Sequence, residues 1–131
     1  MPLSQHPALP IGAKAFSLIA ISFGVNALVR PEHALTFFEW EMPPAGALAE
    51  RQLVEALLYV YGVRDIFWGL AIWIATVYGN NKSAGWMLVA ASGVAFADGY
   101  ICYTWGHGQW GHWSYAPLFT ALGAAFLGLF D

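Results

Sequence analysis

Four long apolar stretches alternate with shorter polar ones along this chain. They cover roughly Ile11–Val29, Leu53–Val77, Ala84–Tyr103 and Trp113–Phe130. Each approaches the roughly 20 residues that a helix needs to cross the hydrocarbon core of a bilayer. The third and fourth have almost no polar face, although a helix on the surface of a soluble bundle needs one. The pattern predicts an all-α integral membrane protein, a four-helix bundle that forms one domain over residues 1–131.

The ends of these stretches support the prediction. Arg30-Pro31 ends the first, since the residue before a proline resists the helical region. Tyr78-Gly79-Asn80-Asn81 is a turn signal between the second and third. Trp and Tyr gather at the ends of the stretches, as in the aromatic belts of membrane proteins. These aromatic residues are Tyr78, Trp86, Tyr100, Tyr103, Trp105, Trp110, Trp113 and Tyr115.

The longest connection, residues 30–52, mixes charged and aromatic side chains. It carries Phe37, Phe38 and Trp40 between acidic residues, followed by the pair Pro43-Pro44. An amphipathic segment of this kind lies in the membrane interface with its apolar side buried, and prolines interrupt a helix. We therefore expect a surface-lying segment in this first long loop.

Composition agrees with a lipid-facing protein. Hydrophobic residues make up 59% of the 131 residues and charged residues 10%, against about 25% charged residues in an average soluble domain. The net charge of −3 with five Lys and Arg gives no basic patch for nucleic acid. We expect a multi-pass protein of the lipid bilayer, in the endoplasmic reticulum if the source is eukaryotic. Two basic residues on each side of the bundle leave the orientation open.

The ionisable residues fall in one half of this bundle. With four spans, the connections 30–52 and 104–112 share one side of the membrane, here called the loop-rich face. At 1.5 Å per residue, Asp98 lies roughly 7 Å inside its span and Asp65 about 18 Å inside its own. Charges at such depth cost about 2.5–3.5 kcal/mol on insertion scales and usually face the bundle interior. We therefore predict a polar cavity that opens toward the loop-rich face.

One stripe of the second span is expected to face inward. Its members recur every three or four residues and are mostly small or acidic, which lets helices approach closely. Arg64 lies off this stripe, and Asp98 on the third span is its expected partner. Either these charges form a structural ion-pair network, or they form a substrate or proton-transfer site. The stripe consists of Glu55, Leu58, Gly62, Asp65, Gly69, Ile72 and Thr76.

Candidate site residues follow from this placement. Asp65 and Asp98 are the candidate proton donors or acceptors, Arg64 positions a carboxylate, and His112 completes a relay at the cavity mouth. Substrate-binding candidates are Glu55, Tyr59, Asn26, Arg30, Trp68 and Trp105. Glu55 and Tyr59 also suit a purely interfacial position, and Asn26 and Arg30 a helix cap. No metal is expected, because His33, His107 and His112 lack ligand spacing, and no cofactor, because no nucleotide-binding fingerprint is present.

The run Tyr61-Gly-Val-Arg-Asp-Ile-Phe-Trp-Gly-Leu70 resembles the second helix of small four-helix DoxX-like proteins. It is most similar to related fungal and bacterial domain-of-unknown-function integral membrane proteins. Asp98 late in the third span and His112 before the fourth agree with that pattern. Some small four-helix membrane proteins of fungal natural-product clusters are cyclases, isomerases or cofactor-free oxygenases. The resemblance thus implies a role in the site for Arg64, Asp65, Asp98 and His112.

These arguments favour a small membrane enzyme that acts by acid–base chemistry on a lipophilic intermediate such as a polyketide or terpenoid. Cyclisation, isomerisation and epoxide opening are the expected reactions. The alternative is a non-catalytic binding, chaperone or scaffold subunit that uses the same polar cavity. Ion or proton transport is less favoured, because the polar residues stop near the midplane unless the chain forms a homo-oligomer.

Overall fold

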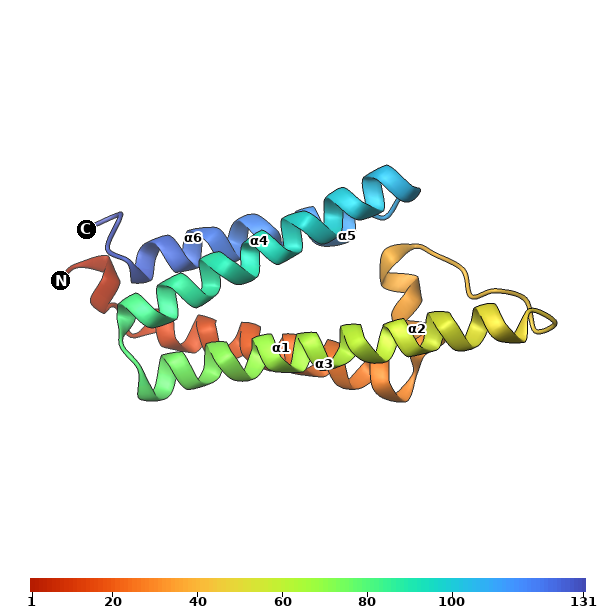
Figure 1. Cartoon of the computed structure of the whole chain (residues 1–131). Coiled ribbons are helices and arrows are strands. Elements are labelled where there is room, and N and C mark those ends of the chain that lie inside the picture. The colour runs from red at the N-terminus through yellow and green to blue at the C-terminus, as the bar shows by residue number, and fades with distance from the viewer.

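The computed structural model covers all 131 residues and contains helices and loops but no strands, which confirms the all-α class. Figure 1 shows the helices running roughly along one axis, with both chain ends at the same end of the molecule. Two short 3-10 turns, η1 and η2, complete the fold. The elements are η1 (Leu3–Gln5), α1 (Ala8–Val29), α2 (Pro31–Leu35), η2 (Thr36–Phe38), α3 (Leu48–Tyr78), α4 (Asn81–Trp105), α5 (Trp110–Trp113) and α6 (Ala116–Phe126).

Three helices, α1, α3 and α4, are long and apolar enough to cross a membrane. The expected fourth span, 113–130, is not one continuous helix. α5 ends at Trp113, a turn at Ser114 and Tyr115 follows, and α6 has 11 residues, or about 16 Å against a hydrocarbon core of about 30 Å. Pro117 lies in the first turn of α6, where a proline is tolerated, whereas it would interrupt a helix continuing from α5.

The helices form two pairs. In the first pair α1 packs along α3, and in the second α4 packs along α6. Glycines face each other in both pairs. A Cβ added at Gly62 would lie 2.7 Å from the carbonyl oxygen of Gly24, and one added at Gly123 would lie 2.8 Å from that of Gly85. Close approach through small residues is the usual way in which helices associate in lipid.

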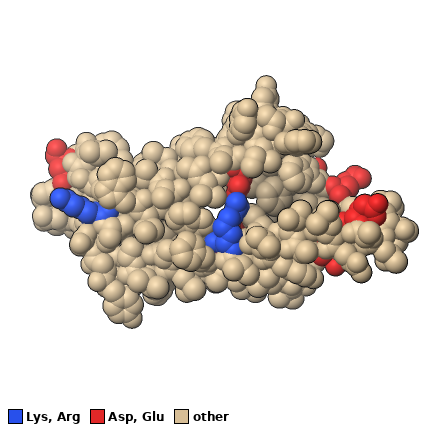
Figure 2. Space-filling model, viewed as in Figure 1, with Lys and Arg blue, Asp and Glu red and all other residues tan.

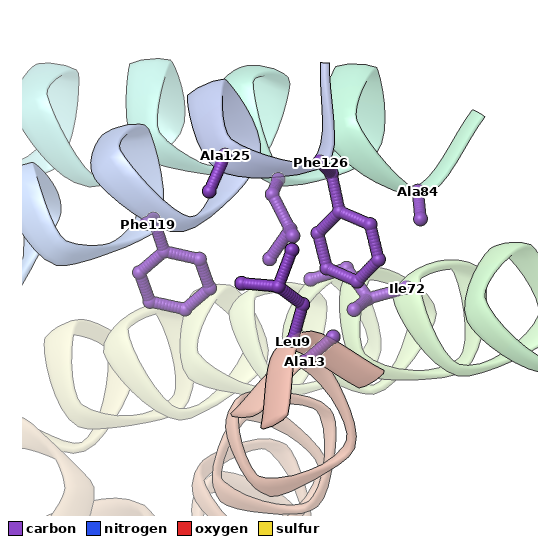
Figure 3. Close-up of a cluster of buried hydrophobic side chains, with 8 residues drawn as sticks. Leu9, Ala13, Ile72, Ala84, Phe119, Ala125 and Phe126 are labelled. Carbon is purple, nitrogen blue, oxygen red and sulfur yellow. The ribbon is translucent and has the colours of Figure 1, made fainter. Parts of the chain in front are cut away.

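The two pairs meet at the end that holds the chain termini and separate toward the other end (Figure 1). At the closed end, an apolar core joins all four helices (Figure 3). The chain ends are tied together there, since Ser4 donates to the Asp131 carboxylate from its N–H (2.8 Å) and its hydroxyl (2.6 Å). These bonds hold the pKa of Asp131 below its usual range. The core consists of Leu9, Ala13, Ile72, Ala84, Leu88, Phe119, Ala125 and Phe126.

Much of the outer surface is apolar, and only 25 of 131 residues are buried. On α3 the exposed large side chains recur every three or four residues on one face. A surface of this extent suits lipid and would be unusual on a water-soluble monomer. This face comprises Leu53, Leu57, Val60, Val63, Phe67, Leu70, Ile74 and Val77.

The first long connection differs from the expected surface-lying segment. α2 and η2 turn inward across the open end of the molecule, where Ala34 and Leu35 are buried against Ala27 and Leu58. In addition, α3 begins at Leu48, five residues before the predicted boundary. The segment therefore closes the wider end of the bundle with its own aromatic side chains.

Candidate functional site

A cavity of about 270 Å³ lies between the two helix pairs. Thirteen of its 17 lining residues are hydrophobic, so an apolar molecule would fit it better than a water-soluble metabolite. Ile19 and Phe23 of α1 line it and are also 50% and 36% exposed. The cavity therefore has an opening beside α1, on the apolar flank of the molecule.

The polar groups of the cavity gather in one part of its wall. Asp65 and Tyr61 come from α3, Asp98 from α4, His112 from α5, and Tyr115 from the turn before α6. The structure brings Asp65, Asp98 and His112, which the sequence analysis assigned to one cavity, into the wall of the same cavity. The cavity is mostly apolar rather than polar as predicted, and apolar residues one to two turns deeper than Asp65 also line it. Among them are Phe16, Ile72 and Phe119.

Arg64 pairs with Asp98, as expected from its place off the inward stripe. Its two terminal nitrogens donate to the two carboxylate oxygens at 3.2 and 2.7 Å, a bidentate geometry that fixes both side chains. The guanidinium also lies 4.9 Å from the centre of the Tyr61 ring, within the range of a cation–π contact. Arg64 itself does not line the cavity. It therefore acts on the site by holding Asp98.

This ion pair links the first helix pair to the second. Figure 2 shows a basic group meeting an acidic one in the hollow between the two halves of the molecule. The Asp98 side chain is 13% exposed and that of Arg64 is 37% exposed. Removing one partner from such a pair leaves an uncompensated charge in a largely apolar setting.

Asp65 is bound less tightly than Asp98. Its nearest cationic atom is Nε of Arg64, 3.8 Å from one carboxylate oxygen, which is too long for a hydrogen bond. The Asp65 side chain is 18% exposed, and the residue lines the cavity. Of the two carboxylates, Asp65 is the one available to a ligand.

His112 is 3% exposed and has one free ring nitrogen. Nδ1 lies 3.2 Å from the Tyr115 hydroxyl, whereas the buried Nε2 has no partner. Burial lowers the pKa of the imidazole, opposed by the nearby Asp98 carboxylate and reinforced by Arg64. The ring is therefore neutral near pH 7, with one nitrogen available to give or accept a hydrogen bond.

The position of His112 is set by the residue that follows it. Trp113 donates its indole N–H to the Phe96 carbonyl oxygen at 3.2 Å. Its ring lies where a Cβ at Gly99 would collide with it. The glycine thus lets α5 rest directly on α4 and places His112 beside Asp98.

The six expected substrate-binding residues do not stay together. Trp68 lines the cavity, and the other five do not. Trp105 is 81% exposed at the end of α4, and Asn26 Oδ1 lies 3.1 Å from Nδ1 of His33. Arg30 and Tyr59 are exposed, and Glu55 is half-buried. These five residues lie toward the loop-rich face, as predicted from sequence, but their side chains do not line the cavity.

Sequence reasoning missed Tyr61, Tyr115 and Phe37 as cavity residues. Tyr61 lies one helical turn before Asp65, a spacing that places both on one face of α3. That signal was available in the sequence. Phe37 had no comparable signal, because it lines the cavity only through the inward turn of η2. No cluster of three or more His, Cys, Asp or Glu side chains suited to a metal ion is present.

Comparison with known proteins identifies one family to which the chain is similar. The model of the family described as Domain of unknown function (DUF4267) matches residues 17–126. The chain belongs to this family. The DUF4267 region runs from within α1 to the last residue of α6 and includes every cavity residue except Phe16. No curated protein and no solved structure matches the chain, and the resemblance to DoxX-like proteins stays a prediction.

Proposed function

We propose that this DUF4267 protein is a multi-pass membrane enzyme that rearranges a lipophilic intermediate, such as a polyketide or terpenoid, by acid–base chemistry. The observation that carries the proposal is the apolar cavity with Asp65 and His112 in one wall. Asp65 lies 3.8 Å from the nearest Arg64 nitrogen and beside Tyr61, and Nε2 of His112 has no partner. Unpaired polar groups in an apolar cavity are typical of sites where a ligand supplies the missing contacts.

The chemistry divides among the residues by their contacts. In epoxide opening, the Asp65 carboxyl group would donate its proton to the epoxide oxygen as the carbon–oxygen bond breaks. A substrate alkene would then form the new carbon–carbon bond. Neutral His112 would accept the proton lost from the neighbouring carbon through Nε2, so that one proton enters and one leaves. Asp98, held by Arg64, would stabilise the positive charge that develops between these steps.

The surroundings suit such a reaction. A carbocation intermediate is quenched by water, and the apolar wall limits water at the reacting carbons. The rings of Tyr61, Trp68 and Phe119 lie in this wall, where aromatic faces attract positive charge. A lipophilic substrate would enter from the bilayer through the opening beside Ile19 and Phe23. In a eukaryotic cell, we place the protein in the endoplasmic reticulum and relate it to the DoxX-like proteins.

The test is turnover by the protein reconstituted in liposomes, with 10,11-epoxyfarnesol and prenylated phenols as probes and gas chromatography–mass spectrometry as the readout. We expect Asp65→Asn to reduce formation of isomeric products by about 100-fold or more, the usual range for a general acid. Asp98→Asn should reduce it less, because Asp98 stabilises charge and donates no proton.

Glu50→Gln is the matched control, because it removes an exposed carboxylate at the start of the same helix. Full turnover in a correctly folded Asp65→Asn variant would contradict the acid–base scheme. A stoichiometric protein partner that co-purifies with an inactive wild-type chain would favour the alternative, a scaffold or chaperone subunit.

A further inference from the structure

A second cavity lies next to the first, toward the loop-rich end of α3. Its volume is about 280 Å³, and seven of its nine lining residues are hydrophobic. Its wall combines one face of α3 with η2 and the segment that follows. The lining residues are Leu35, Phe38, Trp40, Glu41, Pro43, Val54, Leu57, Leu58 and Tyr61.

The two cavities share Tyr61 in their walls. Phe38 lies against this ring at 5.1 Å and against the His112 ring at 5.0 Å. Consecutive residues of η2 thus face different cavities, with Phe37 in the first and Phe38 in the second. What separates the cavities is a pair of aromatic side chains, and one of them belongs to a three-residue turn.

The small volume of the first cavity and the course of α3 between the two cavities indicate what the second cavity binds. Pockets for drug-sized ligands measure about 300–1,000 Å³, so an elongated terpenoid or polyketide exceeds the first cavity alone. From Asp65, successive turns of α3 toward the loop-rich end present Tyr61, Leu58 and Val54, and the latter two line the second cavity. A ligand with its reactive group at Asp65 and its length along α3 would place its tail there.

We infer that the second cavity binds the hydrocarbon tail of the same lipophilic ligand whose reactive end lies beside Asp65 and His112. The Phe38–Tyr61 contact opens to let the tail pass. This inference rests on the lipophilic ligand of the proposed function but does not need turnover. The second cavity would then select intermediates by the length and shape of their hydrocarbon tails.

Photocrosslinking locates the tail directly. The probe is a 10,11-epoxyfarnesol analogue in which a diazirine replaces the hydroxyl group, at the end remote from the epoxide, and it is added to the protein in lipid nanodiscs. After irradiation, peptide mass spectrometry should find the label on the second-cavity residues of α3 and of the segment 38–43. Label confined to the deep part of the first cavity, or spread over lipid-facing side chains of α3 that line neither cavity, such as Val60, Val63 and Phe67, would overturn the inference.

Val54→Trp fills the second cavity, and Val60→Trp is its control, because Val60 is 68% exposed and lines neither cavity. The indole would occupy the volume that the tail needs, so Val54→Trp should lower labelling of the second cavity about tenfold. Val60→Trp should leave it unchanged. Circular dichroism and gel filtration would test whether both variants fold. Leu57→Ala, which enlarges the second cavity, should retain the labelling.

A phospholipid acyl chain is the competing occupant. Native mass spectrometry that finds a tightly bound phospholipid, together with labelling of these residues by a photoreactive phosphatidylcholine and not by the farnesol analogue, would overturn the inference. If the second cavity is labelled but no variant or wild-type protein turns over any probe, the tail site stands and the acid–base proposal fails.

Discussion

At the scale of single residues, the two carboxylates and the histidine of the cavity differ in how far their bonds are satisfied. Both oxygens of Asp98 accept from Arg64, whereas Asp65 has a long contact with the same guanidinium and a hydrogen bond with Tyr61. His112 uses one nitrogen and leaves the other free in a buried position. Unsatisfied polar atoms in an apolar wall reduce stability, and a bound ligand would recover that loss.

His112 gives a pH prediction. Burial holds its pKa below the ordinary value of about 6.5, so the folded protein binds fewer protons than the unfolded chain. Stability should therefore fall as the pH decreases through 6.5 toward the lower pKa of the folded state. His112→Gln should flatten this part of the profile, as measured by thermal unfolding in detergent micelles between pH 5 and 8. An unchanged slope in His112→Gln would contradict it, and His107→Gln, at an exposed histidine in the same loop, serves as control.

The residues found from sequence share a simple property. Asp65, Asp98 and Arg64 are charged at membrane depth, where a charge requires a partner or a cavity. His112 comes close to them because the chain must return along α4. Residues whose placement in the membrane has no such free-energy cost could not be assigned to the cavity from the sequence. Glu55 and Arg30 also carry charge, but at the interface a charge is solvated, so their proximity to the site in sequence did not constrain their position.

At the scale of helices, the glycine contacts determine how closely the members of each pair approach. Gly62 faces the backbone of Gly24, and Gly69 faces that of Ser17, whose hydroxyl donates to the Gly69 carbonyl oxygen. A backbone carbonyl cannot move aside as a flexible side chain can. The inward stripe of α3 therefore has two functions, since its glycines pack on α1 while Asp65 and Ile72 line the cavity.

Gly62→Ala should separate α1 from α3, since the added methyl group would lie 2.7 Å from the Gly24 carbonyl oxygen. We expect a loss of about 1–3 kcal/mol in unfolding free energy, as for other overpacked sites. Gly93→Ala is the matched control, because no atom lies within 4 Å of its Cβ position on α4. It should be neutral or stabilising by up to about 1 kcal/mol. Equal effects of the two substitutions in SDS-unfolding titrations would show that α1 and α3 are not held by this contact.

Hydropathy predicted correctly the helices whose ends are determined by nearby residues, such as capping residues and turns. Asn80 and Ser83 form a capping box that starts α4, close to the turn predicted from sequence. The fourth span was misjudged, because the apolar run continues from Trp113 to Phe130 although the helix is interrupted at Ser114 and Tyr115 and begins again at Ala116. The inward turn of η2 depends on packing against α3 and α5, which no periodicity along residues 30–52 records. Hydropathy measures transfer into an apolar setting and does not distinguish lipid from the protein interior.

At the scale of the whole molecule, the chain makes a closed end and an open end. Both termini and the turn between α3 and α4 meet at the closed end, where the Asn81 side chain donates to the Ser4 carbonyl oxygen. At the open end, α2 and η2 fill the space between the separating helix pairs and supply the partition between the two cavities. Access to Asp65 is therefore from the flank beside α1 or past Phe38, and not through the closed end.

This arrangement predicts the membrane topology. If α5 and α6 together return across the bilayer beside α4, Leu129 lies on the same side as Lys82, and Glu50 lies on the opposite side. In a Cys102→Ser background, single cysteines at these exposed positions are treated with a membrane-impermeable maleimide in sealed vesicles. We expect Lys82→Cys and Leu129→Cys to react together, and Glu50→Cys to react only from the other side or after permeabilisation. If Leu129→Cys is labelled from the same side of the membrane as Glu50→Cys, the chain crosses the membrane three times. In that case α6, only about 16 Å long, ends on the loop-rich side. The cavity between the helix pairs would then lose its wall at Phe119, so the same measurement tests the enclosure on which the site depends.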